Sequence, residues 1–506
     1  MSNDQIAATI SLRSPFDREH LKTDLKGRSV RSGVATMLGQ GALFVIQTAS
    51  TIVLARLLTP ADFGMIAMVT AVTGFAALFK DLGLSMATIQ KAEINHEEIS
   101  ALFWINVAVS AMIALITAAA APAIAWFYGE PCLTLITVAL SLVFLFGGLT
   151  VQHSALLQRQ MRFKALAAIQ VVSMLTGVVA AIAAAAMGTG YWALVIMQVV
   201  SAVFVAIGVW LLCEWRPGSP SRRTDVKSML LFGANLTGFD IVNYFARNFD
   251  NILLGRFWGA STLGLYSRAY NIMMLPISQV RGPLTAVAIS ALSHLQNDPI
   301  RFKRYYIKLI ILIAFITMPL MAFLFVCADQ VILVLLGSQW LGAADIFKIL
   351  CINAFIQPVQ GTAGLVLVTL GQSKRYLTLG TISSIIIVIS FILGLPWGAI
   401  GVAAAYTIAS YLLLVPILWY CFKRTPISIP DFFSAIVRPV IASMIMGLII
   451  FTIRLYLTEV SNIVSIGCSF IIGFLAYLVA FLLLPGGLLH LQEISSYRSF
   501  LFEKSV

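Results

Sequence analysis

The chain has 506 residues, of which 60% are hydrophobic and only 11% are Asp, Glu, Lys or Arg, and its formal net charge is +12. Apolar runs of about 20 residues, the length that an α-helix needs to cross a bilayer, recur along the whole sequence. This composition excludes a soluble globular protein and predicts an all-α polytopic membrane protein. The alternating strands of about ten residues that a membrane β-barrel requires are absent, and the positive charge is typical of cytoplasmic loops rather than of nucleic-acid binding.

The apolar runs predict about fourteen membrane-spanning helices, arranged as six, a linker, six and then two. In chain order, the predicted spans are 33–57, 63–88, 100–127, 133–156, 164–187, 190–213, 227–256, 262–291, 302–327, 343–370, 375–395, 398–422, 432–456 and 461–484. The predicted domains are a cytoplasmic polar tail (1–29), an N-terminal six-helix lobe (30–213), a cytoplasmic linker (214–226), a C-terminal six-helix lobe (227–422), two extra helices (423–484) and a cytoplasmic tail (485–506).

Lysines and arginines are distributed unequally between alternate connections. One side of the membrane receives those of both tails, of the linker and of every second loop, whereas the other side receives only Arg56, Arg256 and Arg454, each at the end of a predicted helix. Because basic loops stay in the cytoplasm, this asymmetry predicts that both termini are cytoplasmic. Arg56 and Arg256 are predicted to cap the C-terminal ends of their helices rather than to touch a substrate.

A motif at the end of the first predicted span recurs 200 positions later, since residues 52–64 align without a gap with residues 252–264. The identical positions are Ile52 and Ile252, Leu54 and Leu254, Arg56 and Arg256, and Gly64 and Gly264. In each copy an apolar helix ends, turns and restarts. Two related halves in a polytopic membrane protein are typical of transporters.

The seventh predicted span carries the densest set of polar side chains, which are Asp240, Asn243, Arg247, Asp250 and Asn251. Their spacing puts them on one side of a helix. A charge that faces lipid is unfavourable, so this face is predicted to line protein or a water-filled cavity. The first span carries neutral residues at the positions 200 residues earlier, which are Gln40, Gln47, Ser50 and Thr51.

The second and eighth predicted spans continue the polar pattern with Lys80 and Asp81 and with Arg268 and Arg281. Spare positive charge in a low dielectric attracts an anion, and the planar guanidinium group suits phosphate. The candidate substrate-binding residues are Arg247, Arg268, Arg281, Lys80, Asn243, Asn251, Gln40 and Gln47. The candidate coupling or ion-pair carboxylates are Asp240, Asp250 and Asp81.

Each of these candidates has a structural alternative. Arg247 can form an ion pair with Asp250 or Asp240 that only stabilises the helix. Lys80 and Arg281 can extend along the helix to the membrane interface.

No motif indicates a metal site or a cofactor. The six cysteines form no metal-type pairs, and the sequence His96-Glu97-Glu98 is not followed by a second histidine at the spacing that zinc requires. A glycine-rich phosphate loop ending in Lys-Ser or Lys-Thr is also absent, which argues against ATP coupling within this chain. The sequence thus predicts no cofactor, no metal and no enzymatic activity.

Three stretches carry a family resemblance. They are Ala-Arg-Leu-Leu-Thr-Pro-Ala-Asp-Phe-Gly-Met-Ile-Ala-Met at 55–68, Asp-Leu-Gly-Leu-Ser-Met-Ala-Thr-Ile-Gln at 81–90 and Leu-Gly-Leu-Tyr-Ser-Arg-Ala-Tyr at 263–270. They resemble polysaccharide-unit flippases of the Wzx type, in the polysaccharide transporter branch of the multidrug/oligosaccharidyl-lipid/polysaccharide exporter superfamily. The resemblance covers nearly the whole chain.

The resemblance implies two pseudo-symmetric six-helix lobes around a central cavity, lined by helices 1, 2, 7 and 8, with two extra helices at the C-terminus. It implies a flippase of the bacterial inner membrane that moves oligosaccharide repeat units on undecaprenyl pyrophosphate by alternating access, for exopolysaccharide or lipopolysaccharide synthesis. It further implies a counter-ion, H+ or Na+, and contacts with a polysaccharide polymerase or glycosyltransferases. Lipid II flippases of this superfamily have an arginine-rich first helix, whereas here the first helix offers glutamines.

Two other functions remain open from the sequence. One is a cation-coupled multidrug or metabolite exporter, in which Asp240 and Asp250 would be the proton-sensitive pair. The other is a membrane polysaccharide polymerase, which would need large outer loops and acidic residues near the interface. The sequence has neither.

Overall fold

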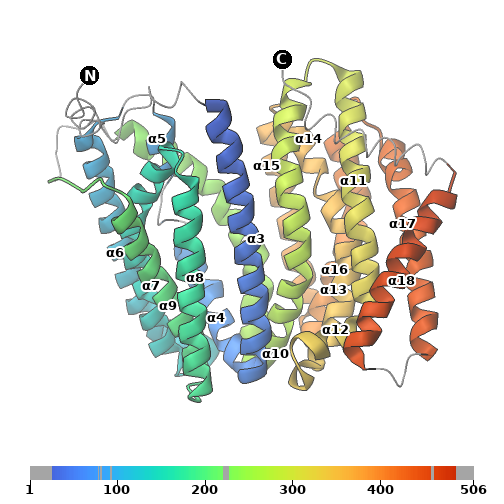
Figure 1. Ribbon diagram of the computed structural model, residues 1–506, viewed down its shortest axis with the longest axis horizontal. Coiled ribbons are helices and arrows are strands. Elements are labelled where there is room, and N and C mark those ends of the chain that lie inside the picture. Colours follow the sequence, from blue (N-terminus) through green and yellow to red (C-terminus); the bar gives the residue numbers. More distant parts are fainter. Residues whose placement is uncertain are drawn as a thin grey trace, which may run out of the picture. The chain divides into compact units, whose positions relative to one another are not determined.

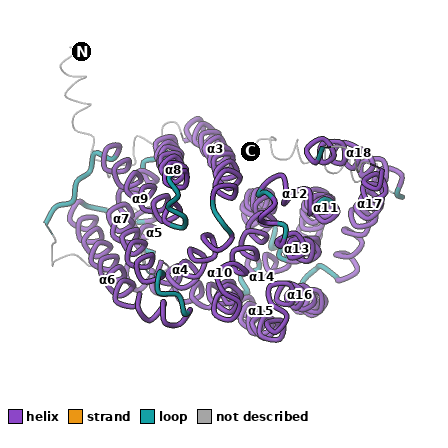
Figure 2. Tube along the Cα trace, turned by 90° about the horizontal axis from the view of Figure 1, so that it is seen from below, coloured by secondary structure: helices purple, strands orange, loops and turns teal. Residues whose placement is uncertain are grey.

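The computed structural model describes residues 25–77, 79, 83–91, 94–219, 227–456 and 461–485, and the side chains of 25–35, 227–243, 245 and 246 are not described. Over this part of the chain, helices are the only regular elements (Figures 1 and 2). The α-helices are α3 (Leu25–Leu57), α4 (Pro60–Ala77), α5 (Leu84–Gln90), α6 (His96–Tyr128), α7 (Leu133–Arg159), α8 (Phe163–Ala186), α9 (Trp192–Leu212), α10 (Lys227–His294), α11 (Pro299–Val326), α12 (Ala328–Leu335), α13 (Gly342–Gln360), α14 (Ala363–Thr369), α15 (Ser373–Gly394), α16 (Gly398–Phe422), α17 (Ile429–Tyr456) and α18 (Asn462–Leu483).

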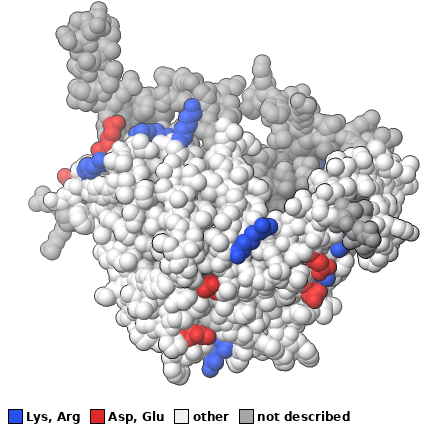
Figure 3. All heavy atoms as spheres, turned by 60° about the horizontal axis from the view of Figure 1, so that its bottom comes forward, with Lys and Arg blue, Asp and Glu red and all other residues white. Residues whose placement is uncertain are grey.

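Twelve segments of the described chain are helical, long and apolar enough to cross a membrane. Two of them, Arg247–His294 and Ser373–Phe422, hold two spans each, because α10 is divided at Gly259 and α16 follows α15 after a single short turn. The total is therefore fourteen, and the predicted all-α polytopic fold is confirmed. The face drawn in Figure 3 agrees with this, since most of its described surface is uncharged.

Two predicted spans are interrupted in the structure. In the second span α4 ends at Ala77 and α5 begins at Leu84, directly after Gly83, whose φ of 69° lies in the left-handed region that favours glycine. In the tenth span α13 ends at Gln360 and α14 begins at Ala363. Hydropathy is high on both sides of each break, so the sequence pattern does not reveal them.

The chain divides into two compact units, Met1–Asn248 with Gly259–Ser261, and Phe249–Trp258 with Thr262–Val506. The division falls within α10 because the first part of this helix packs with the N-terminal helices: the hydroxyl of Tyr244 donates to the carbonyl oxygens of Thr70 (2.9 Å) and Ala71 (3.0 Å). The lobe boundaries drawn from the sequence stay a prediction.

The N-terminal unit contains a buried chain of polar side chains. The hydroxyl of Thr88 on α5 donates to Gln152 on α7 (2.8 Å), and the amide nitrogen of Gln152 donates to Asn106 on α6 (2.9 Å). Arg159, at the end of α7, donates to the carbonyl oxygens of Thr88 (2.9 Å) and Lys91 (2.6 Å). A cation therefore caps the C-terminal end of α5 and fixes this short helix on the unit.

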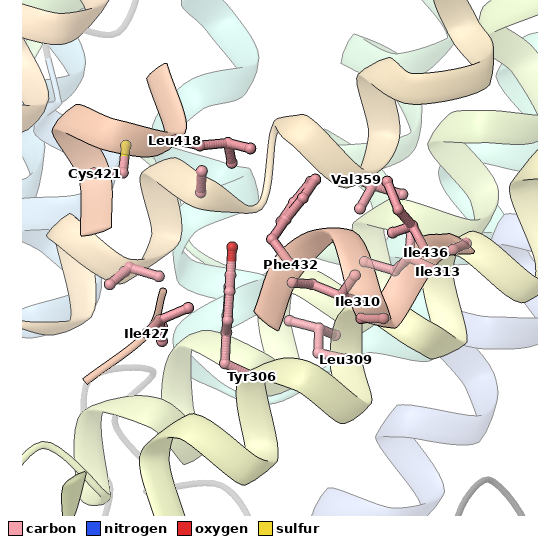
Figure 4. Close-up of a cluster of buried hydrophobic side chains, with 14 of the residues drawn as sticks. Tyr306, Leu309, Ile310, Ile313, Val359, Leu418, Cys421, Ile427, Phe432 and Ile436 are labelled. Atoms are coloured by element: carbon pink, nitrogen blue, oxygen red, sulfur yellow. The ribbon is translucent and has the colours of Figure 1, made fainter. Parts of the chain in front are cut away.

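The C-terminal unit has a large hydrophobic core where α11, α13, α16 and α17 meet (Figure 4). Tyr306 lies in the middle of this core, is fully buried, and shares a hydrogen bond of 3.1 Å with Thr362 at the break between α13 and α14. The aliphatic side chains of Leu309, Ile310 and Ile313 follow it on the same face of α11. This packing holds the broken helix in place beside an unbroken one.

Candidate functional site

The first copy of the repeated motif is a helical hairpin with a capped turn between α3, which ends at Leu57, and α4, which begins at Pro60. The hydroxyl and the backbone N–H of Thr59 both donate to one carboxylate oxygen of Asp62, at 2.7 and 2.8 Å, and the N–H of Asp62 donates back to the hydroxyl at 3.3 Å. Such a reciprocal cap satisfies groups that the start of a helix leaves free. Arg56 lies in the last turn of α3, where a cation stabilises the helix end.

The second copy turns without a cap. Gly259 interrupts α10 with φ 78° and ψ 178°, a conformation that is open to glycine. The indole N–H of Trp258 donates to the carbonyl oxygen of Leu395, in the turn between α15 and α16, at 2.8 Å. Arg256 lies on the surface, with its guanidinium 5.8 Å from the centre of the Phe257 ring. The second turn is therefore fixed by a docked tryptophan.

A buried carboxylate lies about two turns before this second turn. Asp250 is 5% exposed, and one of its oxygens accepts a hydrogen bond of 2.8 Å from the hydroxyl of Tyr266, which is 1% exposed. The other oxygen accepts from the backbone N–H of Asn251 at 2.8 Å. The side-chain oxygen of Asn251 is buried and has no hydrogen-bond partner among the described residues. The two hydrogen bonds to Asp250 fix the position of its carboxylate inside the span.

Arg247 lies one turn before Asp250 on the same helix. Its side chain is exposed, and it forms no hydrogen bond or ion pair with any described residue. Asp250 accepts its side-chain hydrogen bond from Tyr266, and the other predicted ion-pair partner, Asp240, has a side chain outside the described set. Arg247 is thus a cation inside a span whose charge no described neighbour neutralises.

Arg268 and Arg281 lie in the second part of α10 and are both half-buried. Their positions are separated by about 20 Å along the helix, so they do not form one cluster. Arg281 donates to the carbonyl oxygen of Gly361, at the break between α13 and α14, at 3.4 Å. A Cβ atom on residue 361 would lie 2.6 Å from Arg281 Nη2, so glycine is needed for the guanidinium to lie against this break.

The polar residues of the first span behave differently. Gln40 and Gln47 are exposed on α3. The hydroxyl groups of Ser50 and Thr51 donate to the carbonyl oxygen of Gln47, at 2.9 and 2.8 Å. They are therefore engaged by their own helix, and only the two glutamines remain available on this face.

Four further candidates are not placed by the structure. Asp240 and Asn243 belong to α10, but their side chains are outside the described set, and Lys80 and Asp81 lie outside the described residues. Among the described residues, the structure thus brings together Asp250 and Asn251. It also shows no group of three or more His, Cys, Asp or Glu within that part of the chain that could hold a metal ion.

Comparison with known proteins places this arrangement in a family. A family model described as "Polysaccharide biosynthesis protein" matches residues 53–345, more than half of the chain and nearly all of both copies of the repeated motif. The chain belongs to the polysaccharide biosynthesis protein family. The resemblance to Wzx-type proteins that the sequence motifs carry is thereby confirmed.

Relatives of this polysaccharide biosynthesis protein span most of its length. It is 24% identical to lipopolysaccharide biosynthesis protein WzxC of Escherichia coli (strain K12), over 83% of this chain and 87% of WzxC. It is 26% identical to succinoglycan biosynthesis transport protein ExoT of Rhizobium meliloti (strain 1021), over 90% of this chain and 92% of ExoT. Lipid II flippase MurJ shares the fold, with a TM-score of 0.73 and 16% identity over 91% of this chain and 100% of MurJ.

Sequence reasoning about this family member missed Tyr266. The residue belongs to the motif at 263–270, but its role depends on a contact with Asp250 across the hairpin turn. A tyrosine in an apolar run is more often a packing residue, so the only available signal was its position 16 residues after an intramembrane carboxylate.

Proposed function

We propose that this protein is a flippase that moves oligosaccharide repeat units linked to undecaprenyl pyrophosphate across the bacterial inner membrane, by alternating access, for exopolysaccharide or lipopolysaccharide synthesis. It acts as a transporter and not as an enzyme, with both termini in the cytoplasm. Family membership supports the substrate class, and the names of WzxC and ExoT point to the same polysaccharide pathways.

The observation that carries the proposal is Arg247. A cation inside a membrane span is unfavourable unless it meets a partner or water, and here no described side chain neutralises it. A guanidinium group binds phosphate oxygens through two parallel hydrogen bonds. The pyrophosphate of a carrier lipid supplies the charge that this position lacks, while the exposed amides of Gln40 and Gln47 suit sugar hydroxyls.

Asp250 supports an ion-coupled cycle. Its carboxylate is buried, and one oxygen accepts a hydrogen bond from the hydroxyl of Tyr266 while the other accepts from the backbone N–H of Asn251. Taking up H+ or Na+ changes the charge of this site, and a charge change inside a span shifts the balance between two conformations. Asp250 is therefore the coupling residue in the proposed cycle, and the same residue would serve the alternative of a cation-coupled drug exporter.

The test is flipping by purified protein in liposomes loaded with a fluorescent undecaprenyl-pyrophosphate oligosaccharide. Arg247→Ala is expected to reduce the flipping rate at least about a hundredfold, because one desolvated charge-assisted contact is worth several kcal/mol. Arg247→Lys is expected to retain part of the rate. Arg256→Ala is the matched control, since Arg256 is also exposed on α10 but lies at the helix end.

Full activity of Arg247→Ala would contradict the proposal. Cells that lack the protein should accumulate unflipped repeat units, and normal polysaccharide export in such cells would also overturn it. Efflux of cationic dyes by the liposomes, with no movement of the lipid-linked sugar, would favour the exporter.

A further inference from the structure

The segment that follows α9, residues 213–219, is docked on the N-terminal unit and is called the strap below. Cys213 and Trp215 are 1% and 3% exposed and belong to the buried core of this unit, whereas Glu214 and Arg216 are exposed. This alternation is that of an extended segment with one face on a core. The first part of the predicted linker is therefore a packed element.

Three hydrogen bonds join the strap to α6. The N–H of Gly218 donates to the hydroxyl of Ser100 at 2.9 Å, and its carbonyl oxygen accepts from the indole of Trp104 at 2.8 Å. The indole N–H of Trp215 donates to Nδ1 of His96 at 3.1 Å. An imidazole nitrogen accepts a hydrogen bond only when it carries no proton, so this third bond requires a neutral His96.

A second histidine lies beneath the strap. His153 on α7 is 0% exposed, and its ring is stacked on Trp210 at 4.5 Å and in edge contact with Trp215 at 5.2 Å and Phe103 at 5.7 Å. Neither ring nitrogen has a hydrogen-bond partner among the described residues. The guanidinium of Arg216 lies 5.5 Å from the centre of the same Trp210 ring.

Among the described residues, the charged group that acts on His153 is the cation Arg216, which disfavours an imidazolium there. The titratable and charged side chains of the surrounding elements are His96, Glu97, Glu98 and Lys91 near the start of α6, Arg159 on α7, Arg162 before α8, and Cys213, Glu214 and Arg216 on the strap. Glu98 is paired with Lys91 at 2.7 Å, Glu97 and Glu214 are exposed, and α9 contributes only the indole of Trp210. Burial raises the pKa of the Cys213 thiol, so this group is neutral too.

We propose that His96 and His153 form a proton-operated latch, in which two neutral imidazoles keep the strap docked and protonation releases it. A proton on Nδ1 of His96 removes the acceptor of Trp215. A proton on His153 creates a buried cation beside Arg216, and such a cation is stabilised when the strap gives water access. Because the released state binds more protons, docking weakens as the pH falls.

The strap begins the connection between the two predicted lobes, so its release lengthens the connection that is not packed on the N-terminal unit. Only this consequence for transport rests on the proposed function. The latch itself belongs to the N-terminal unit and is tested without substrate.

Cys213 is a reporter built into the strap. In the full-length protein in nanodiscs, with the other five cysteines replaced by Ser, maleimide labelling of Cys213 is measured at about pH 7.5 and about pH 5.5, which span imidazole titration. Each rate is divided by the rate in unfolded protein at the same pH, which removes the effect of thiolate content. We expect this ratio to rise about tenfold or more at the lower pH.

Variants separate the latch from general acid sensitivity. His153→Phe fills the same aromatic site without a titratable group and is expected to reduce the pH effect, and His153→Phe with His96→Gln should abolish it, because the glutamine oxygen still accepts from Trp215. A variant that retains only Cys132 should show no pH effect.

A ratio that does not change with pH in the otherwise unmodified chain would overturn the latch, as would an equal rise in the double histidine variant. If the cysteine-substituted chain fails to fold, tryptophan fluorescence of the native chain replaces labelling. Quenching at low pH that His153→Phe removes supports the latch, and quenching that persists contradicts it. Neither measurement involves flipping, so failure of the latch leaves the flippase proposal untouched.

Discussion

The two hairpins of the repeat share a sequence motif but differ in the polar side chains at equivalent positions. In the first, residue 50 is a serine whose hydroxyl donates to its own helix, and residue 66 is a buried isoleucine. In the second, the equivalent positions are Asp250 and Tyr266, which form a buried hydrogen bond across the turn. One hairpin is closed by a cap, the other by a glycine break and a docked tryptophan.

The difference shows that duplicated structure does not require duplicated chemistry. Each hairpin keeps an apolar helix, a turn and a glycine after it, Gly64 or Gly264. The charged groups gather in the second copy, where the turn also lacks the polar cap of the first. We therefore expect the second hairpin to supply the charged contacts with substrate and ion, and the first to supply the neutral contacts of Gln40 and Gln47.

The largest expected effect comes from Gly64. A Cβ atom at this position would lie 1.7 Å from the carbonyl oxygen of Ala260, and backbone atoms cannot yield as a flexible side chain can. Gly64→Val should lower the free energy of unfolding by about 3 kcal/mol or more. Thermal unfolding in detergent measures this, with Gly41→Val as control because a Cβ there meets nothing within 4 Å. Equal melting temperatures of the two variants would contradict the close approach.

An intermediate effect is expected when the second hairpin receives the residues of the first. Asp250→Ser with Tyr266→Ile removes both partners of one buried hydrogen bond, which is often nearly neutral for stability, so the protein should fold but lose at least about tenfold in ion-driven flipping. Tyr266→Phe alone leaves the carboxylate short of a donor and should lower stability by about 1–3 kcal/mol. Flipping with and without an ion gradient, together with thermal unfolding, separates the two roles. Wild-type transport by the double variant would show that the difference between the hairpins is not functional.

The smallest expected effect is at the cap. Thr59→Ala removes the hydroxyl from the reciprocal cap with Asp62 and should lower the free energy of unfolding by about 1 kcal/mol, without changing the flipping rate. Thr59→Ser restores the hydroxyl and should restore the melting temperature. A transport defect in Thr59→Ala that Ser does not rescue would contradict a purely stabilising role of the cap.

Hydropathy and charge predicted the number of helices and most of their bounds, because a bilayer imposes the length and polarity of every span. The breaks after Ala77 and Gln360 were not predictable, since they depend on backbone conformation within apolar sequence. The hydrogen bond between Asp250 and Tyr266 was not predictable either, because it joins residues on the two sides of the hairpin turn. The sequence did contain a signal for the burial of Trp215, because apolar and charged residues alternate at 213–216. This signal is easily missed, since the residues that follow are mostly polar.

The break at Gly259 also has a consequence for how the chain enters the membrane. The first part of α10 contains Asp240, Arg247 and Asp250, and each such residue near the centre of a span costs about 2.5–3.5 kcal/mol on insertion. Tyr266, which donates to Asp250, follows the turn in the chain and so enters the translocon after the first part of α10. We therefore expect the two parts of α10 to leave the translocon together as a helical pair, and a nascent chain that stops at residue 259 to leave its last helix outside the lipid.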